Sequence, residues 1–286
     1  MGNDPIALTA ADFNNDGKKD IATANFSGNT ISIFLGTGTG SLSNATNYAA
    51  GGGPRSIKSA DFNSDGKMDL VMVSGGSANV FFGNGNGTFQ PYVFYPVGSN
   101  PYRVVTADFN GDGNTDIATL NNGSNNVSIL SGSPTGTFTS LGTYSLGSSL
   151  GSFHVNDLNG DGKLDLVAGS YFNPGKLYFL LGHGTGFFNQ AVSYDIGYGA
   201  TAIASGDFNG DGSPDLALVD GNTTRAFMSG IAPSVSVSGP SITCSGSPIT
   251  LAATGSNYYN WSTGATSSTV SVAPIINTTY SVTVSN

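Results

Sequence analysis

The sequence contains no glutamate, only one cysteine and few charged residues of any kind. Charged side chains make up 9% of the 286 residues, whereas about 25% is usual. No apolar run approaches the roughly 18 residues that cross a bilayer. The lone cysteine, Cys244, cannot form a disulfide within the chain. We therefore expect no membrane insertion in this chain and no disulfide-stabilised fold.

Basic residues are also scarce, with nine lysines and arginines scattered along the chain. A nucleic-acid-binding surface needs a basic patch, so nucleic acid is not an expected partner. The segment MGNDPIALTA has neither the basic nor the apolar region of a signal peptide. We expect the chain to be a piece of a longer protein.

Glycine, in contrast, is abundant, with 42 residues in a chain that is 38% hydrophobic and 10% aromatic. Good helix formers are few, and glycine interrupts every stretch that could form a long helix. Valine, isoleucine, phenylalanine and tyrosine favour strands. The composition predicts an all-β protein with many tight turns.

The acidic residues are concentrated in one repeated motif. All 18 are aspartates, and only Asp4, Asp195 and Asp220 lie outside five copies of D-[FL]-N-x-D-G-x-x-D-[IL]. The copies begin at Asp12, Asp61, Asp108, Asp157 and Asp207, at spacings of 49, 47, 49 and 50 residues. We call residues 12–20, 61–69, 108–116, 157–165 and 207–215 the acidic loops, with positions 1 to 9.

Each repeat also contains four short apolar segments. One precedes the acidic loop, one follows it, a third ends in a glycine-rich turn such as GNGNG, and a fourth contains a tyrosine. Four strands per period of about 40–50 residues are typical of a β-propeller blade. A solenoid of β-coils is the alternative, although its repeats are usually shorter. The fifth repeat lacks its tyrosine segment before Ile231.

The acidic loop has the chemistry of a calcium site. Oxygen-bearing residues at positions 1, 3 and 5 followed by glycine at position 6 match the first half of an EF-hand loop. Position 9 adds a third carboxylate, and the carbonyl of position 7 can add another oxygen. Six or seven oxygens suit Ca²⁺ better than Mg²⁺. Five bound Ca²⁺ would change the net charge from −9 to about +1.

Two other interpretations of the loop are weaker. An EF-hand needs a carboxylate at position 12 and a following helix, but that position holds Thr23, Met72, Thr119, Ala168 or Leu218. A simple turn needs one or two such residues, not four at fixed spacing. We therefore predict about five calcium ions, with these ligands: Asp12, Asn14, Asp16, Lys18, Asp20, Asp61, Asn63, Asp65, Lys67, Asp69, Asp108, Asn110, Asp112, Asn114, Asp116, Asp157, Asn159, Asp161, Lys163, Asp165, Asp207, Asn209, Asp211, Ser213 and Asp215.

The repeats resemble FG-GAP/VCBS repeats, the calcium-loop blades of integrin α-subunit propellers and of many bacterial surface proteins. The resemblance covers about residues 3–230, and the family's metal-site positions match in every copy. It implies a β-propeller of four-stranded blades, of which seven would be usual for the family. It also implies a bacterial source and an extracellular or cell-surface location.

The amino-acid composition changes at Ile231, after which serine, threonine and valine dominate. Alternation in segments such as TVSVA predicts strands. Residues 231–286 resemble a small bacterial Ig-like module, with Trp261 as its core anchor. Cys244 has no partner there, and we expect the module to lack a final strand. The predicted domains are a propeller at 1–230 and an Ig-like β-sandwich at 231–286.

Catalytic residues are hard to find. His154 and His183 lie in different repeats, and Cys244 lies in the tail, so we predict that the chain is not an enzyme. The segments that enter the first strand of each repeat vary more, and we expect this rim to contact a ligand. The rim residues are Arg55, Lys58, Tyr102, Arg103, His154 and Tyr198.

The predicted function is adhesion or ligand binding by a secreted, calcium-stabilised propeller, with an extracellular protein or polysaccharide as partner. One alternative is a carbohydrate-active enzyme or its accessory propeller, such as a polysaccharide lyase. Another is a structural spacer in a surface fibre.

Overall fold

The structure is a computed structural model that describes residues 2–210, 212–220, 223–227, 236–239, 245–254 and 258–285. The chain divides into two compact units, Met1–Phe227 and Met228–Asn286, which we call unit 1 and unit 2. Across the described residues, no helix has the length and apolar character needed to cross a membrane. All elements of the described residues are strands, which agrees with the all-β prediction.

Unit 1 contains one antiparallel sheet for each of the five repeats, and within each sheet the strands follow chain order. The first four sheets have four strands, which confirms the prediction for those repeats, and the described part of the fifth has three. The strands are β1 (Pro5–Ala11), β2 (Asp20–Asn25), β3 (Thr30–Phe34), β4 (Thr46–Ala49), β5 (Ser56–Ala60), β6 (Asp69–Ser74), β7 (Ser77–Phe81), β8 (Val93–Pro96), β9 (Pro101–Ala107), β10 (Asp116–Asn121), β11 (Asn126–Ser131), β12 (Thr139–Ser145), β13 (Leu150–Asn156), β14 (Asp165–Ser170), β15 (Lys176–Leu180), β16 (Val192–Asp195), β17 (Ala202–Gly206), β18 (Asp215–Val219) and β19 (Thr224–Phe227).

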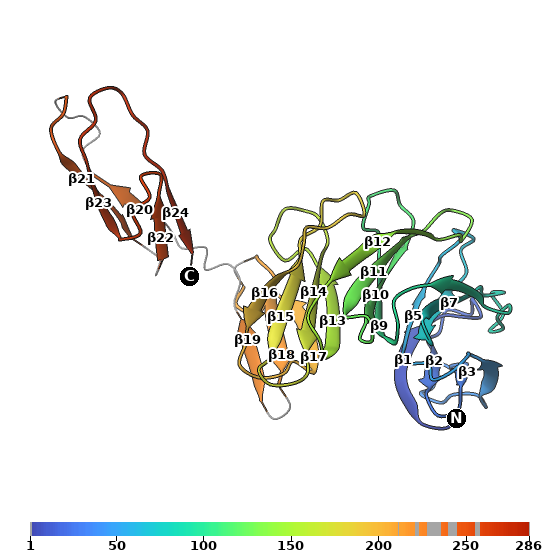
Figure 1. Cartoon of the computed structure of the whole chain (residues 1–286). Helices are drawn as coiled ribbons and strands as arrows, with labels where there is room; N and C mark the ends of the chain where they lie inside the picture. The colour runs from blue at the N-terminus through green and yellow to red at the C-terminus, as the bar shows by residue number, and fades with distance from the viewer. Residues whose placement is uncertain are drawn as a thin grey trace. The chain divides into compact units, whose positions relative to one another are not determined.

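The first strands of successive sheets lie side by side, in the order β1, β5, β9, β13 and β17 (Figure 1). The hydrophobic core is divided among the spaces between neighbouring sheets. One cluster, for example, joins Ile33 of the first sheet to Leu70 and Phe81 of the second. Strand β6 is consequently buried at every residue. Burial on both faces explains why its sequence, DLVMVS, is nearly continuous in apolar residues.

Repeated aromatic contacts join each sheet to the next. Phe109, at position 2 of its loop, and Tyr144 of β12 both pack edge-on against Phe188 of the following repeat, with ring centroids 5.6 and 5.8 Å apart. The same three-ring contact is formed by Phe13, Tyr48 and Phe89, and by Phe62, Tyr95 and Phe138. Each edge-on pair contributes about 0.5–1.5 kcal/mol beyond its burial. Position 2 therefore fastens the acidic loop to the neighbouring sheet.

The fifth repeat departs from this pattern. Phe208 occupies position 2 but is 51% exposed, whereas Phe13, Phe62 and Phe109 are buried at this position. Within the described residues, no sixth sheet of unit 1 follows to cover the ring.

The described residues of unit 2 form two small antiparallel sheets. One contains β20 (Ser236–Ser238), β21 (Ile249–Thr254) and β23 (Thr269–Val272), and the other contains β22 (Tyr258–Trp261) and β24 (Val282–Ser285). Trp261 is buried with Ala253, Val270 and Val272, as expected of a core anchor. Cys244 lies outside the described residues, and the Ig-like assignment stays a prediction.

Candidate functional site

The acidic loops close around their own side-chain oxygens. In the third loop, Asp108 Oδ2 accepts the N–H of Gly113 at 2.8 Å, and Asn110 Oδ1 accepts the N–H of Asp112 at 2.9 Å. Gly113 has a φ of 84°, a left-handed conformation that glycine adopts without strain. Loops 1, 2 and 4 repeat both hydrogen bonds, and the accepting residues are Asp12 and Asn14, Asp61 and Asn63, and Asp157 and Asn159. The sharp turn predicted at position 6 is therefore present.

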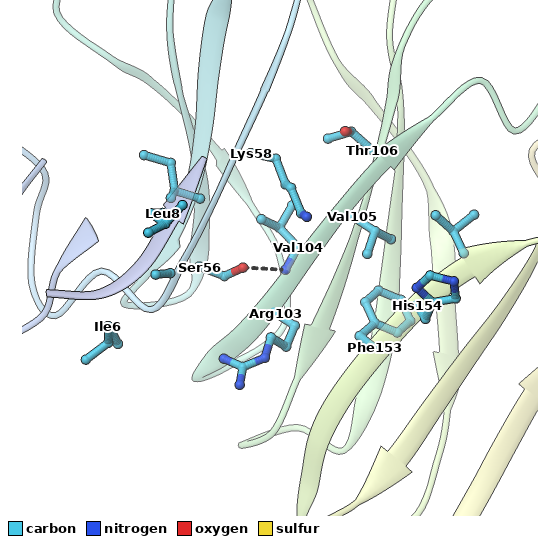
Figure 2. A pocket seen from close by; sticks show the side chains of 13 residues that line it. Ile6, Leu8, Ser56, Lys58, Arg103, Val104, Val105, Thr106, Phe153 and His154 are labelled. Carbon is cyan, nitrogen blue, oxygen red and sulfur yellow. Dashed lines mark hydrogen bonds between the residues drawn. The ribbon is translucent and has the colours of Figure 1, made fainter. Parts of the chain in front are cut away.

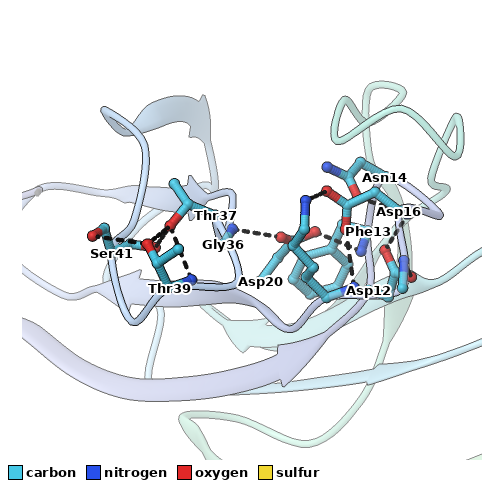
Figure 3. A network of polar contacts seen from close by, with 11 residues as sticks. Asp12, Phe13, Asn14, Asp16, Asp20, Gly36, Thr37, Thr39 and Ser41 are labelled. Atoms are coloured by element: carbon cyan, nitrogen blue, oxygen red, sulfur yellow. Dashed lines mark hydrogen bonds and ion pairs between the residues drawn. The ribbon is translucent and has the colours of Figure 1, made fainter.

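The aspartate at position 9 has a second role, which the sequence analysis missed. Asp20 Oδ2 accepts the N–H of Phe13 at 2.8 Å, and its Oδ1 accepts the N–H of Gly36 at 2.7 Å (Figure 3). Asp69, Asp116 and Asp165 make the same two contacts, and all of these side chains are fully buried. This carboxylate thus joins the start of the loop to the turn after the third strand. A glycine 14 to 17 residues after position 9 in these four repeats is the signal that could have revealed it.

Burial and mutual repulsion set the electrostatics of the loops. Burial, followed by the charges of Asp65 and Asp61, raises the pKa of Asp69 to about 6. Burial likewise raises the pKa of Asp116. At position 5, in contrast, the hydrogen bond from Lys18 keeps the pKa of Asp16 below its usual range. A cation between these carboxylates would relieve their repulsion.

The donor set of each loop fits Ca²⁺ in its chemistry, with three carboxylates and an amide as hard oxygen donors. In the arrangement that the described residues adopt, however, no three carboxylate, imidazole or thiol groups meet closely enough to hold a metal ion. Lysine ammonium groups stand beside the position 5 carboxylate in three loops, at 3.0 Å in Lys18–Asp16, 3.1 Å in Lys67–Asp65 and 3.8 Å in Lys163–Asp161. Asp211, the predicted position 5 ligand of the fifth loop, lies outside the described residues.

A second feature, which we call the axial cavity, lies among the first strands of the first four repeats (Figure 2). Its volume is about 410 Å³, and β1, β5, β9 and β13 line it. Three of the predicted rim residues meet there, namely Lys58, Arg103 and His154. Tyr198 does not join them, because it stacks on Arg225, with the guanidinium carbon 4.9 Å from the ring centroid.

His154 makes a contact across two repeats. Its Nε2 lies 2.7 Å from Ser205 Oγ, which also accepts a hydrogen bond from Asn156 Nδ2 at 2.7 Å. Burial, and then the charge of Lys58, hold the pKa of His154 below its ordinary value. Among the described residues, no carboxylate lines this cavity. His183 lies apart, in an exposed turn.

One protein family and several solved structures are similar to this chain. The family model described as an FG-GAP-like repeat matches residues 12–72, 61–119 and 157–218, which together make up more than half of the chain. No curated protein sequence matches significantly.

Three solved structures are similar to the chain. A lectin of Agrocybe aegerita that recognises non-reducing terminal N-acetylglucosamine is 21% identical, with a TM-score of 0.53 over 77% of this chain and 65% of the lectin. A candidate 6-phosphogluconolactonase of Bacteroides uniformis is 17% identical, with a TM-score of 0.63 over 80% of this chain and 68% of that protein. Its counterpart from Bacteroides fragilis is 19% identical, with a TM-score of 0.59 over 79% and 66%. At these identities the likeness concerns the fold alone.

Proposed function

This chain belongs to the FG-GAP-like repeat family, and we propose that it is a calcium-binding module that presents a ligand-binding surface of a secreted bacterial cell-surface protein. The observation that carries the proposal is the recurrence of the same oxygen donors at positions 1, 3, 5 and 9 of five acidic loops. Fifteen carboxylates in clusters of three repel one another without a cation. Calcium would relieve that repulsion in every repeat.

The affinity expected of such loops supports an extracellular location. Extracellular calcium modules bind at roughly 10⁻⁴–10⁻³ M, so they fill outside cells and stay empty in the cytosol. Under this proposal, calcium orders the loops while the sheets present variable first-strand residues to a polysaccharide or protein. Unit 2 would serve as an Ig-like connecting module.

We propose binding rather than catalysis for unit 1. Enzymes position an acid, a base or a nucleophile beside one another. Here His154 is the one imidazole among the described residues that line the axial cavity, and no carboxylate stands among those lining residues. Such a site favours recognition over bond cleavage.

Calorimetric titration of the full chain with CaCl₂ tests the proposal. We expect about five ions to bind at roughly 10⁻⁴–10⁻³ M, with MgCl₂ binding much more weakly. A matched variant, Asp112→Asn, should lose one ion and leave the others in place. Absence of calcium binding up to 10⁻² M, or equal binding of both ions, would contradict the proposal.

A further inference from the structure

The axial cavity gathers positive charge in a chain whose net charge is −9. Lys58 reaches it from β5 and Arg103 from β9. Neither residue forms an ion pair within the described residues. Five other basic residues do form ion pairs, namely Lys18, Lys67, Lys163, Lys176 and Arg225. Lys58 and Arg103 are therefore two basic side chains that line the same cavity and have no ion-pair partner among the described residues.

The guanidinium group of Arg103 is held by stacking, not by a carboxylate. Its carbon lies 4.4 Å from the Tyr102 ring centroid, and the carbon of Arg55 lies 5.3 Å from that centroid and 4.5 Å from the centroid of Phe26. Stacking covers the flat face of a guanidinium and leaves its N–H edge available for a carboxylate. Of the five donors on this group, one bonds within the described residues, from Nη1 to Tyr102 O at 3.3 Å.

The walls of the cavity are amphipathic. Ile6 and Leu8 line it and are 44% and 66% exposed, so they present apolar surface to a ligand in the cavity. Ser56 and Thr106 add hydroxyl groups to the same walls. A pyranose ring offers both C–H surfaces and hydroxyl groups, so it complements such walls, whereas a bare inorganic anion would leave the apolar part unused. The volume of about 410 Å³ lies in the range of small-ligand sites, about 300–1,000 Å³.

We propose that the axial cavity binds a saccharide bearing a carboxylate, such as a uronic acid unit, with Lys58 and Arg103 contacting the carboxylate and Leu8 contacting the ring. This inference rests on the proposed ligand-binding function and names its ligand class. His154, across the cavity from Lys58, lies close enough to report on occupancy (Figure 2).

Nuclear magnetic resonance of the two histidine side chains tests the inference on the full chain in saturating calcium. Methyl glucuronoside is the acidic probe, methyl glucoside the neutral one and sulfate the bare anion. We expect the glucuronoside to shift the His154 signals and leave those of His183, in its exposed turn, unchanged. A hydrogen bond to a charged group contributes enough for roughly a tenfold or larger difference, so the glucoside should bind at least about tenfold more weakly.

Charge-removing variants locate the contact. Lys58→Met and Arg103→Met should each weaken glucuronoside binding by about tenfold or more. Lys176→Met is the matched control, because it removes the same charge from β15, outside the cavity, and should leave the affinity unchanged. A variant is compared with the parent chain only if it melts at the same temperature in calcium. The histidine signals of the parent chain test the inference even if a variant does not fold.

Several outcomes would overturn the inference. They are equal binding of glucuronoside and glucoside, sulfate binding as tight as glucuronoside binding, an unmoved His154 signal, and undiminished binding in both charge variants. Equal binding of the two glycosides would leave the proposed ligand-binding function intact. That function fails separately, in the calcium titration.

Discussion

The acidic loops and the axial cavity are built from neighbouring segments of the same repeats, yet they differ in what the repeats share. Positions 1, 3, 5 and 9 hold the same residue types in all five loops. At the third residue before each loop, the five repeats hold Thr9, Lys58, Val105, His154 and Ala204, and of these Lys58, Val105 and His154 line the axial cavity. The loop residues are repeated because every sheet needs the same contacts. The residues three places before each loop are not constrained in this way, which leaves them available for ligand recognition.

The two regions also differ in how their charges are satisfied. In the first four loops, the buried position 9 carboxylate accepts two backbone N–H groups within its own repeat, as Asp116 does from Phe109 and Gly132. Lys58 and Arg103 have no carboxylate partner among the described residues. Changes in the loops should therefore alter stability, and changes in the cavity should alter binding.

Calcium removal should produce the largest effect, which is a loss of thermal stability limited to unit 1. Each filled site adds about 1.4 kcal/mol at tenfold excess over Kd, and about 1 kcal/mol moves the melting temperature of a domain this size by roughly 2–4 °C. Several sites together should raise the unfolding temperature of unit 1, followed by circular dichroism, by roughly 10 °C or more relative to EDTA.

Unit 2 supplies the internal control for that experiment. Trp261 is the only tryptophan, and residues 226–286 contain no charged side chain. The tryptophan fluorescence transition should therefore not respond to calcium. If calcium raised the unfolding temperature of both units, or of neither, the predicted difference between the acidic loops and the rest of the chain would be wrong.

Without bound metal, a substitution at position 9 of a loop should lower the free energy of unfolding, and a substitution at position 5 should change it little. Asp116→Asn replaces one of two acceptor oxygens by an N–H₂ group, which leaves a buried N–H unpaired at a cost of about 1–3 kcal/mol. Asp112→Asn is the same chemical change on an exposed side chain and should cost less than about 1 kcal/mol in EDTA. Urea unfolding in EDTA and in calcium measures both. Equal losses in EDTA would show that position 9 has no separate structural role.

The smallest expected effect concerns the pKa of His154. Lys58→Met removes the second cause of its lowered pKa, so the value should rise while burial keeps it below the ordinary one. A lowered pKa means that the unfolded chain binds more protons, and stability is lost as the pH falls through the ordinary histidine pKa of about 6.5. The variant should lose less stability than the parent between pH 7 and pH 5. An unchanged histidine titration curve would mean that Lys58 does not face His154.

Much of the local structure follows from the amino-acid pattern. Glycine at position 6, flanked by short oxygen-bearing side chains, predicts a left-handed turn wherever it occurs, and the backbone of Gly17 and Gly113 adopts one. The apolar segments on either side of each loop predict the first and second strands of each repeat, from β1 and β2 to β17 and β18.

Contacts between repeats could not be predicted in this way. Phe188 packs on Phe109 and Tyr144, which are both more than 40 residues away in the sequence. Phe208 has the same local sequence as Phe109 but is exposed, since its environment depends on the next sheet.

The sequence by itself therefore determined the period, the strands and the donors of the acidic loops, because these depend on residues within one repeat. Only the tertiary structure decided that Lys58, Arg103 and His154 line one cavity and that Phe188 packs on Phe109 and Tyr144. The reason is physical. Side chains from different repeats meet only when the sheets pack, and the packing distances between sheets are not encoded in the pattern of any single repeat.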